Sequence, residues 1–390
     1  MAGHPLLSGP FLRVTLANFF FFLNFASFFL LPLHIKQLGG NEGTVGAIMG
    51  SAGLAGLIVL PLVGASIDRI GRRRFLVAGA VGMTLLSGGF LFVDRLGPAI
   101  FALRVLQGVS FSLAFTAATT LAAEFAPVAR RAEALGLFGI STLSTHAIAP
   151  ALGEEIVHWG GFPALFSVAM AISTVAVGLA ASVPGGGPRP RPPADVEPWR
   201  MDRMQWALGG TMACCGLAFG AVLTFIPTFV RATGLGRVGV FFGTYTAAAV
   251  LTRVVGGGLS DAVGRRAVVL PTLLMLAGAV LLLAFVRNVA MLAAAAGLFG
   301  LAQGLSYPTL NAFAVDLSAE AHLGRTQALF NGTFNAGVTA SAFAFGAVAE
   351  RFGHRPMFVL AAVPPLLGWA LFYFATNREA AEDGAGRSRG

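Results

Sequence analysis

The chain has 390 residues, of which 56% are hydrophobic and only 11% are charged, and its formal net charge is +9. A water-soluble domain carries about 25% charged residues, so this composition excludes a water-soluble protein. The apolar residues fall in blocks of about 20, long enough to cross the roughly 30 Å hydrocarbon core of a bilayer. The sequence therefore predicts an all-α membrane protein, whose basic residues set topology rather than bind nucleic acid.

Twelve transmembrane helices are predicted, and one long polar connection follows the sixth. That connection, PGGGPRPRPPADVEPWRMDR, has the proline, glycine and arginine content of a flexible linker. We expect an N-terminal six-helix bundle over 1–183, a cytoplasmic connector over 184–205, a C-terminal six-helix bundle over 206–377 and a tail over 378–390. The predicted spans are 11–34, 44–67, 75–93, 99–124, 133–154, 162–183, 206–230, 239–260, 267–286, 290–316, 326–349 and 356–377.

The distribution of basic residues predicts the orientation. Seventeen of the 26 lie at the termini or in loops on the amino-terminal side, and seven lie in the opposite loops. Since loops rich in arginine and lysine stay in the cytoplasm, both termini are predicted to be cytoplasmic, in the inner membrane of a bacterium.

Three motifs recur in the two halves at nearly one offset. Asp68 and Asp261 follow the second span of each half and are 193 residues apart. A Gln-Gly pair recurs in the fourth and tenth spans, 196 residues apart, and Arg131 and Arg325 begin similar segments 194 residues apart. Repeated halves of this kind place a binding site between them near the membrane midplane.

We call the segments that contain Asp68 and Asp261 the two hinge copies. The first of them resembles the signature of a known family. Gly64-Ala-Ser-Ile-Asp68-Arg69-Ile-Gly71-Arg72-Arg73-Arg74 resembles the signature between helices two and three of the major facilitator superfamily. Arg104-x-x-Gln107-Gly108 resembles the fourth-helix motif of its drug and metabolite:proton antiporters. Ala149-Pro150-Ala151-Leu152-Gly153-Glu154 matches an exporter motif, Gly-Pro-x-x-Gly-Gly, only in part, which leaves export and uptake both open.

The resemblance implies that the two hinge copies form a cytoplasmic latch between the halves when the cavity opens outward. We expect Gly64 to allow close helix approach and Asp68 to accept hydrogen bonds. The alternative is an arginine patch that only sets topology. The second copy has Ala262 where the family has arginine, so the first is expected to be stronger. The predicted latch residues are Gly64, Asp68, Arg69, Gly71, Arg72, Arg73, Asp261, Gly264, Arg265 and Arg266.

Arg104 lies within the fourth predicted span, where an insertion scale assigns a guanidinium a cost of about 2.5 kcal/mol or more. It should therefore face water or a partner, and Gln107 shares its helix face. By resemblance the two serve substrate binding, and Arg104 also proton coupling. The alternative is that Arg104 snorkels to the outer headgroups.

His146 is the first candidate for carrying a coupled proton, because an imidazole titrates near neutral pH. The alternative is a structural histidine that only hydrogen-bonds a neighbouring carbonyl. The sequence has no Asp or Glu at the middle of a predicted span. Glu154 is a second candidate, with Glu155 beside it, although both could be solvated loop acids.

Polar side chains at helical spacing predict either a wet cavity or hydrogen bonds between helices. Tyr245 and Arg253 in the eighth span are further candidates. The predicted substrate-binding residues are Asn24, Arg104, Gln107, His146, Tyr245, Gln303, Tyr307, Asn311, Asn331 and Asn335.

No nucleophile–base arrangement, phosphate loop or metal-ligand spacing is present, so we expect no enzyme, cofactor or metal. The predicted function is proton-coupled export of small apolar or amphipathic compounds by alternating access, performed by a monomer in the lipid bilayer. The alternatives are uptake of a small metabolite such as a sugar or organic acid, lysolipid transport, and a receptor on the same scaffold.

Overall fold

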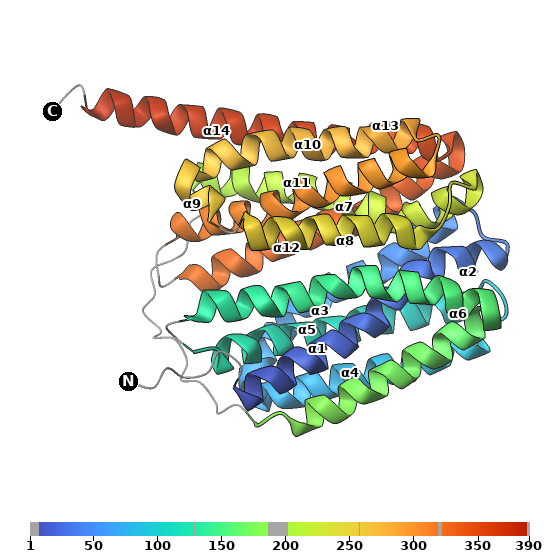
Figure 1. The fold of residues 1–390 in the computed structure, drawn as a ribbon. Helices are drawn as coiled ribbons and strands as arrows, with labels where there is room; N and C mark the ends of the chain where they lie inside the picture. The colour runs from blue at the N-terminus through green and yellow to red at the C-terminus, as the bar shows by residue number, and fades with distance from the viewer. Residues whose placement is uncertain (1–7, 128–129, 186–201, 257, 319–321, 388–390) are drawn as a thin grey trace.

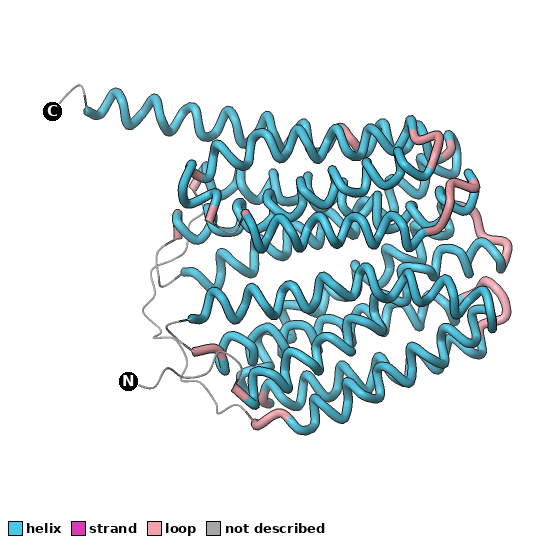
Figure 2. Tube along the Cα trace, viewed as in Figure 1, coloured by secondary structure: helices cyan, strands magenta, loops and turns pink. Residues whose placement is uncertain are grey.

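The structure, a computed structural model, describes residues 8–127, 130–185, 202–256, 258–318 and 322–387 (Figure 1). The side chains of residues 68, 132, 323–324 and 378–387 lie outside this description. All regular elements of the described residues are helical (Figure 2), which confirms the predicted fold class.

The elements described in full in the first half of the chain are α-helices and short 3₁₀ turns. They are α1 (Gly9–Ser27), η1 (Phe28–Leu30), α2 (Leu31–Gln37), α3 (Glu42–Ile70), α4 (Arg72–Gly89), η2 (Phe90–Phe92), α5 (Pro98–Phe125) and α6 (Arg131–Ser182). Elements α1, η1 and α2 together form one span, Gly9–Gln37. Helix α6 contains a break at Gly161, whose φ of 68° lies in the left-handed region, so it comprises two successive spans.

The second half begins with a capping box, in which Asp202 and Gln205 satisfy each other's backbone N–H groups. Its helices are α7 (Arg203–Thr233), α8 (Val238–Val255), α9 (Leu259–Val263), α10 (Arg265–Phe285), α11 (Val289–Asp316), α12 (Leu323–Phe352), α13 (His354–Ala361) and α14 (Val363–Arg387).

The described residues contain ten helices long and apolar enough to cross a membrane. Because α6 comprises two spans and the 30-residue α12 is also long enough, the structure is consistent with twelve spans. One predicted end was wrong: helix α8 ends at Val255 rather than 260, where a run of glycines disfavours helix. The last candidate span ends at Asn377, and helix α14 continues beyond it to Arg387.

Figure 1 shows α1–α6 on one side of the molecule and α7–α14 on the other, with both ends of the chain toward the same end of the helices. We call that end, which contains residues 70–72 and 263–265, the hinge end. The opposite end, with residues 37–42, 233–238 and 352–354, is the distal end. Across the boundary between the halves α3 packs against α12, and α6 against α8. The division into two bundles at the connector remains a proposal.

The buried apolar side chains form two clusters, one within the first half and one that extends over both halves. One cluster of buried side chains, including Phe11, Leu76 and Leu121, belongs entirely to the first half. The other includes Phe29 and Ile48 of the first half together with most buried side chains of the second half. The halves are therefore joined by a common apolar core.

Each hinge copy turns at a glycine. Gly71 separates α3 from α4 with a φ of 103°, and Gly264 separates α9 from α10 with a φ of 92°. These positions are 193 residues apart, like Asp68 and Asp261. Only glycine adopts such a φ readily, because it has no Cβ. The repeat seen in the sequence is thus a repeat of backbone geometry.

Gly71→Ala should lower the free energy of unfolding by about 1–3 kcal/mol, because an L side chain is strained at this φ even though nothing lies within 4 Å of the added Cβ. Gly178→Ala is the matched control, since Gly178 is an exposed α6 residue with equally open space. There alanine favours the helix and should raise stability slightly. Thermal unfolding in detergent measures both changes, and an unchanged Gly71→Ala would contradict the strain argument.

Candidate functional site

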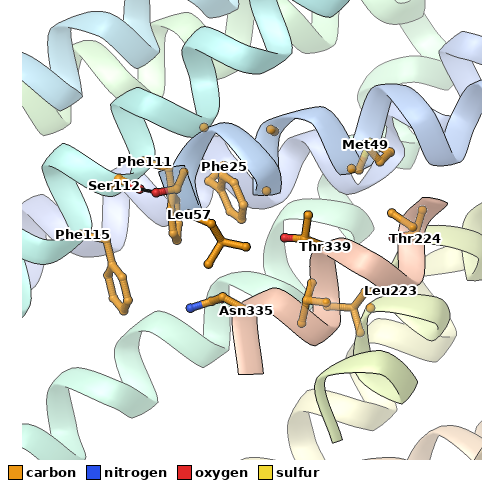
Figure 3. A pocket seen from close by; sticks show the side chains of 18 of the residues that line it. Phe25, Met49, Leu57, Phe111, Ser112, Phe115, Leu223, Thr224, Asn335 and Thr339 are labelled. Carbon is orange, nitrogen blue, oxygen red and sulfur yellow. Dashed lines mark hydrogen bonds between the residues drawn. The ribbon is translucent and has the colours of Figure 1, made fainter. Parts of the chain in front are cut away.

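A cavity of about 280 Å³ lies between the two halves (Figure 3). It is lined by α1, α3, α5 and α6 of the first half and by α7 and α12 of the second. Phenylalanines make up much of the lining, namely Phe22, Phe25, Phe29, Phe111, Phe115, Phe219 and Phe334. Its polar uncharged side chains are Ser112, Thr116, Thr224, Asn335 and Thr339.

The first-half phenylalanines form a continuous aromatic wall, defined as Phe22, Phe25, Phe29, Phe111 and Phe115. The Phe25 and Phe111 ring centroids are 4.5 Å apart, and those of Phe22 and Phe115 are 5.1 Å apart. Contacts at these distances hold the rings in place. Phe22 and Phe25 lie one turn apart on α1, as Phe111 and Phe115 do on α5, so each pair shares a helix face. This spacing is visible in the sequence, although the wall was not predicted from it. The wall offers a flat apolar surface to a ring or an alkyl chain.

Arg104 lies in the cavity wall on the side of α5. Its side chain is buried, with 4% of the residue exposed, and its Nη1 donates to Gln107 Oε1 at 2.9 Å. The buried Arg104 Nε has no hydrogen-bond partner, and neither has Gln107 Nε2. Because a snorkelling arginine would place its charge at the membrane surface, that alternative is wrong. Gln107 does not line the cavity, but its Oε1 holds the Arg104 guanidinium through this hydrogen bond.

His146 on α6 also lines the cavity, as predicted for a substrate or proton ligand. Its ring contacts Phe29 edge-on, with centroids 5.1 Å apart, and lies 6.3 Å from the Tyr245 ring. Its Nδ1 is buried without a hydrogen-bond partner. This nitrogen therefore makes no bond to a neighbouring carbonyl.

The predicted polar stripes contribute one more lining residue, Asn335, whose Nδ2 donates to the carbonyl of Asn331 at 2.9 Å. Asn331 itself accepts from the Tyr307 hydroxyl and donates to Gln327 O. Here the stripe joins α11 to α12 rather than lining the cavity.

Asn24 was predicted to bind substrate, but it does not line the cavity in this conformation. Its Nδ2 donates to Ser87 Oγ at 2.8 Å and to the Ala169 carbonyl at 2.6 Å, and the residue is fully buried. The amide thus joins α1 to α4 and α6, as polar residues do between membrane helices.

Four other predicted ligands lie outside the lining: Gln107, Tyr245, Gln303 and Asn311. Tyr245 packs against Phe241, Phe219 and Phe299 and is 2% exposed. Gln303 is 5% exposed and leaves its Nε2 without a partner. Of the ten predicted substrate-binding residues, the cavity brings together Arg104, His146 and Asn335.

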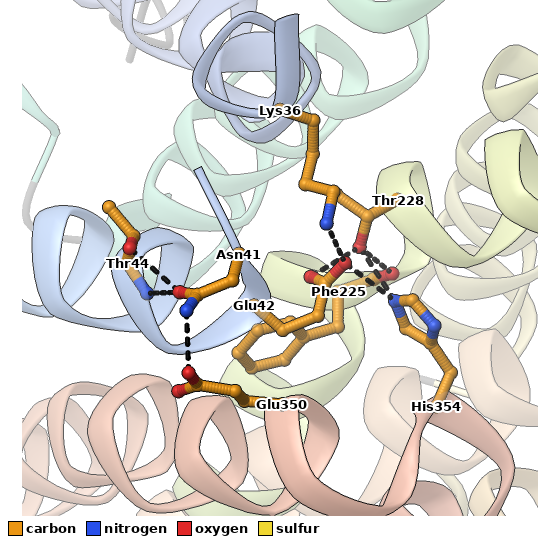
Figure 4. A network of polar contacts seen from close by, with 8 residues as sticks. All are labelled: Lys36, Asn41, Glu42, Thr44, Phe225, Thr228, Glu350 and His354. Atoms are coloured by element: carbon orange, nitrogen blue, oxygen red, sulfur yellow. Dashed lines mark hydrogen bonds and ion pairs between the residues drawn. The ribbon is translucent and has the colours of Figure 1, made fainter. Parts of the chain in front are cut away.

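A polar network, which we call the distal gate, joins the halves at the distal end (Figure 4). Glu42 at the start of α3 pairs with Lys36 Nζ at 3.1 Å and accepts from Thr228 Oγ1 of α7 at 3.1 Å. His354 Nε2 of α13 lies 2.9 Å from Thr228 Oγ1 and 3.5 Å from Glu42 Oε1. One buried carboxylate of the first half thus contacts two helices of the second.

Two further contacts complete the distal gate. Asn41 caps α3 and donates to Glu350 Oε1 of α12 at 2.5 Å. Glu154 accepts from the backbone N–H groups of Val238 and Gly239 at 2.8 and 2.6 Å, so it caps the start of α8. Glu154 therefore lies outside the cavity and is not a solvated loop acid either. The adjacent Glu155 pairs with Arg237.

Glycines on α3 bring the halves into backbone contact near the distal gate. A Cβ at Gly46 would lie 2.1 Å from the Ala342 carbonyl oxygen, and one at Gly53 would lie 2.3 Å from Thr339 Oγ1. Gly50 has similarly little space beside Phe343. Small residues allow this approach of α3 to α12. Neither these three glycines nor the distal gate, apart from Glu154, was predicted from the sequence.

At the hinge end, the contacts that the structure describes for Arg72, Arg73 and Arg265 stay within one half. Arg72 pairs with Glu124 of α5, and Arg73 donates to the Ala181 carbonyl of α6. Arg265 pairs with Asp261 and Asp316.

Arg266 donates to Asn377 and lies over the Tyr373 ring, 5.7 Å from its centroid. The side chain of Asp68 lies outside the described part of the structure. Nothing lies within 4 Å of a Cβ added at Gly64, so the close helix approach predicted there is absent from this conformation. Arg69 is exposed. The predicted latch between halves remains a prediction for another conformation.

Comparison with known proteins agrees with this architecture. An uncharacterized MFS-type transporter, YhhS of Escherichia coli K12, is 29% identical over 275 residues, which cover 65% of this chain and 65% of YhhS. The staphylopine export protein of Staphylococcus aureus is 22% identical over 374 residues, 91% of this chain and 93% of that protein.

A solved bacterial homologue of the human lysosomal transporter Spinster, in an inward-facing and occupied conformation, has a TM-score of 0.81 at 14% identity. The match covers 96% of this chain and 98% of that chain, and it shows the fold alone. The sequence model of the Major Facilitator Superfamily matches residues 14–242 and 208–389. This chain therefore belongs to the Major Facilitator Superfamily, whose members are transporters and not enzymes.

Proposed function

We propose that this transporter exports small amphipathic compounds from the cytoplasm in exchange for protons. The observation that carries the proposal is the central cavity, whose walls come from both halves and combine phenylalanines with a few polar side chains. Sites of this composition bind a ligand through apolar contacts and orient it through few hydrogen bonds. The similarity to an export protein over 91% of the chain supports the direction.

The distribution of basic residues supports placing the hinge end, with both termini, in the cytoplasm of a bacterial inner membrane. In that orientation the distal gate faces the outside. Its contacts between the halves close the outer side, whereas the contacts described above for Arg72 and Arg265 lie within their own halves. This arrangement suits loading from the cytoplasm. Rocking of the halves would then break the distal gate and join the hinge copies.

His146 is our candidate for the proton carrier. Among the described lining residues it carries the one imidazole, the side-chain type whose unperturbed pKa lies near neutral pH, and its Nδ1 has no hydrogen-bond partner in the protein. The described carboxylates lie at or beyond helix ends and at the break region of α6. A neutral imidazole offers one acceptor nitrogen, and protonation removes it. A substrate that donates a hydrogen bond to this nitrogen would lose that bond when His146 takes up a proton, as exchange requires.

His146→Gln should abolish proton-driven transport, because the glutamine amide hydrogen-bonds but does not titrate. Exchange of substrate without a gradient should persist within a few-fold. His158→Gln is the control, since His158 is exposed near the distal end of α6. Proton movement measured with a pH-sensitive dye in proteoliposomes separates the variants. Full coupling in His146→Gln would remove His146 as the carrier.

Proteoliposomes with an acidic interior test the exporter proposal. Molecules inserted with the hinge end outward should accumulate a transported compound inside, and collapsing the pH gradient should stop accumulation. We would use a matched set of naphthalene probes: a sulfonate, an alcohol and a quaternary amine. If none of them accumulates in response to the gradient, proton-coupled export of this compound class is wrong. Accumulation only with the opposite gradient would indicate uptake instead.

A further inference from the structure

We infer that the cavity selects organic anions: molecules with an aromatic or alkyl body and one carboxylate, sulfonate or phosphate group. This inference rests on the proposed function in taking the cavity as the transport site. It adds the charge of the substrate, which the proposed function leaves open.

The charge of the substrate is inferred from Arg104. A guanidinium has five N–H donors in a rigid fork, and the described contacts of Arg104 provide it with one protein acceptor, Gln107 Oε1. Its buried Nε points to no acceptor. A bound carboxylate or sulfonate supplies two oxygens in the geometry that this fork matches. Such a ligand would satisfy donors that the protein leaves unsatisfied.

The rest of the described lining offers no opposing charge. Among those residues Arg104 and His146 are the only ionisable side chains, and none is Asp or Glu. Three acids of the described helices already have partners elsewhere: Glu42 and Glu154 belong to the distal gate, and Glu124 pairs with Arg72. A cationic ligand would therefore meet a buried positive charge without compensation, which disfavours it.

A second arginine extends the positive field from the cavity toward the hinge end. Arg253 of α8 has a buried Nε without a hydrogen-bond partner. Its Nη1 lies 3.5 Å from the position of a Cβ on Gly139, which belongs to α6 of the other half. An anion that enters from the hinge end would pass this side chain before it reaches Arg104, so the field would favour its entry.

The aromatic wall favours a ligand with an apolar body in addition to its anionic group. Phe25 and Phe111, with ring centroids 4.5 Å apart, lie on the side of the cavity formed by α1 and α5, the helix that carries Arg104. A ligand that buried only its anionic group would leave this wall in contact with water. An apolar body removes that surface from water. The expected substrate is thus an amphipathic anion rather than an inorganic one.

Binding of the three naphthalene probes to the purified full-length protein tests the inference by calorimetry. The probes are 2-naphthylmethanesulfonate, 2-naphthylmethanol and (2-naphthylmethyl)trimethylammonium. We expect the sulfonate to bind at least about tenfold more tightly than the cation. Arg104→Gln should reduce sulfonate affinity about tenfold or more and leave the alcohol within about threefold. Arg104→Lys should retain part of the preference, because it keeps the charge but loses the fork.

Arg95→Gln is the control for net charge, since Arg95 is an exposed loop residue of the same charge, and its affinities should match the unmodified protein. Equal binding of all three probes, binding of none, or sulfonate binding unchanged by Arg104→Gln would overturn the anion site. Gradient-driven export of the alcohol or the cation alone would also overturn it while leaving export standing. Tight sulfonate binding without gradient-driven export would leave the anion site standing and contradict the proposed function.

Discussion

Gly46→Leu should abolish transport while leaving insertion and folding intact. Gly46 is where α3 of the first half meets the backbone of α12, and even a Cβ there would lie 2.1 Å from the Ala342 carbonyl oxygen. The obstacle is backbone, so a rotamer change cannot relieve it. Overpacking of this kind costs about 3 kcal/mol or more, which would reduce the closed distal state more than a hundredfold relative to the open one.

Disulfide formation between Asn41→Cys and Glu350→Cys measures this closure directly, because the native side chains are hydrogen-bonded across the halves. The native Cys214 and Cys215 are first replaced by serine. The crosslink should form readily in the protein that retains Gly46 and should be lost in Gly46→Leu.

The matched control is Gly278→Leu. Gly278 is exposed on α10, and nothing lies within 4 Å of an added Cβ there. Its crosslinking and transport should equal those of the unmodified protein. A Gly46→Leu protein that still crosslinks and transports would show that α3 and α12 need not approach so closely.

Glu42→Ala should open the distal gate without any steric change. The substitution removes the acceptor of Lys36 Nζ and Thr228 Oγ1 and the carboxylate beside His354. A hydrogen bond to a charged group stabilises by about 2 kcal/mol, so the closed-to-open ratio should fall about thirtyfold. Exposure of Lys36, 41% of its side chain, limits the contribution of its ion pair.

Reactivity of a cysteine in the cavity reports this opening. With Cys214 and Cys215 replaced, Thr339→Cys labelled by a membrane-impermeant reagent from the distal side should react about thirtyfold faster in Glu42→Ala. Glu133→Ala is the control, because Glu133 pairs with Arg130 of the same half and is exposed, and labelling should not change. Equal labelling in Glu42→Ala would mean that the carboxylate does not hold the gate closed.

The sequence predicted what depends on local pattern and on the repeat. Apolar block length predicted the spans, and the 193-residue offset linked the two hinges, which the structure shows turning at Gly71 and Gly264. Arg104 and His146 were identifiable because a buried ionisable residue in a span is unusual for any structural purpose.

The remaining features depend on which residues from opposite halves meet. In the sequence Glu42 is an ordinary acid in the first turn of a helix. Only the structure shows that Thr228 and His354 of the other half lie beside it. Asn24 and Asn335 look alike in sequence, yet one joins three helices and the other faces the cavity. Periodicity places a residue on a helix face, but the rotation of that helix within the bundle decides what the face contacts.

Pulsed electron–electron distance measurement in lipid nanodiscs tests the central claim, that the halves rock about one cavity. Spin labels at Gln37 and Arg351 report the distal end, and labels at Ile70 and Arg325 report the hinge end; all four residues are exposed. We predict that Glu42→Ala lengthens the distal distance and shortens the hinge distance together. Distances that stay unchanged, or that lengthen at both ends, would contradict alternating access in this protein.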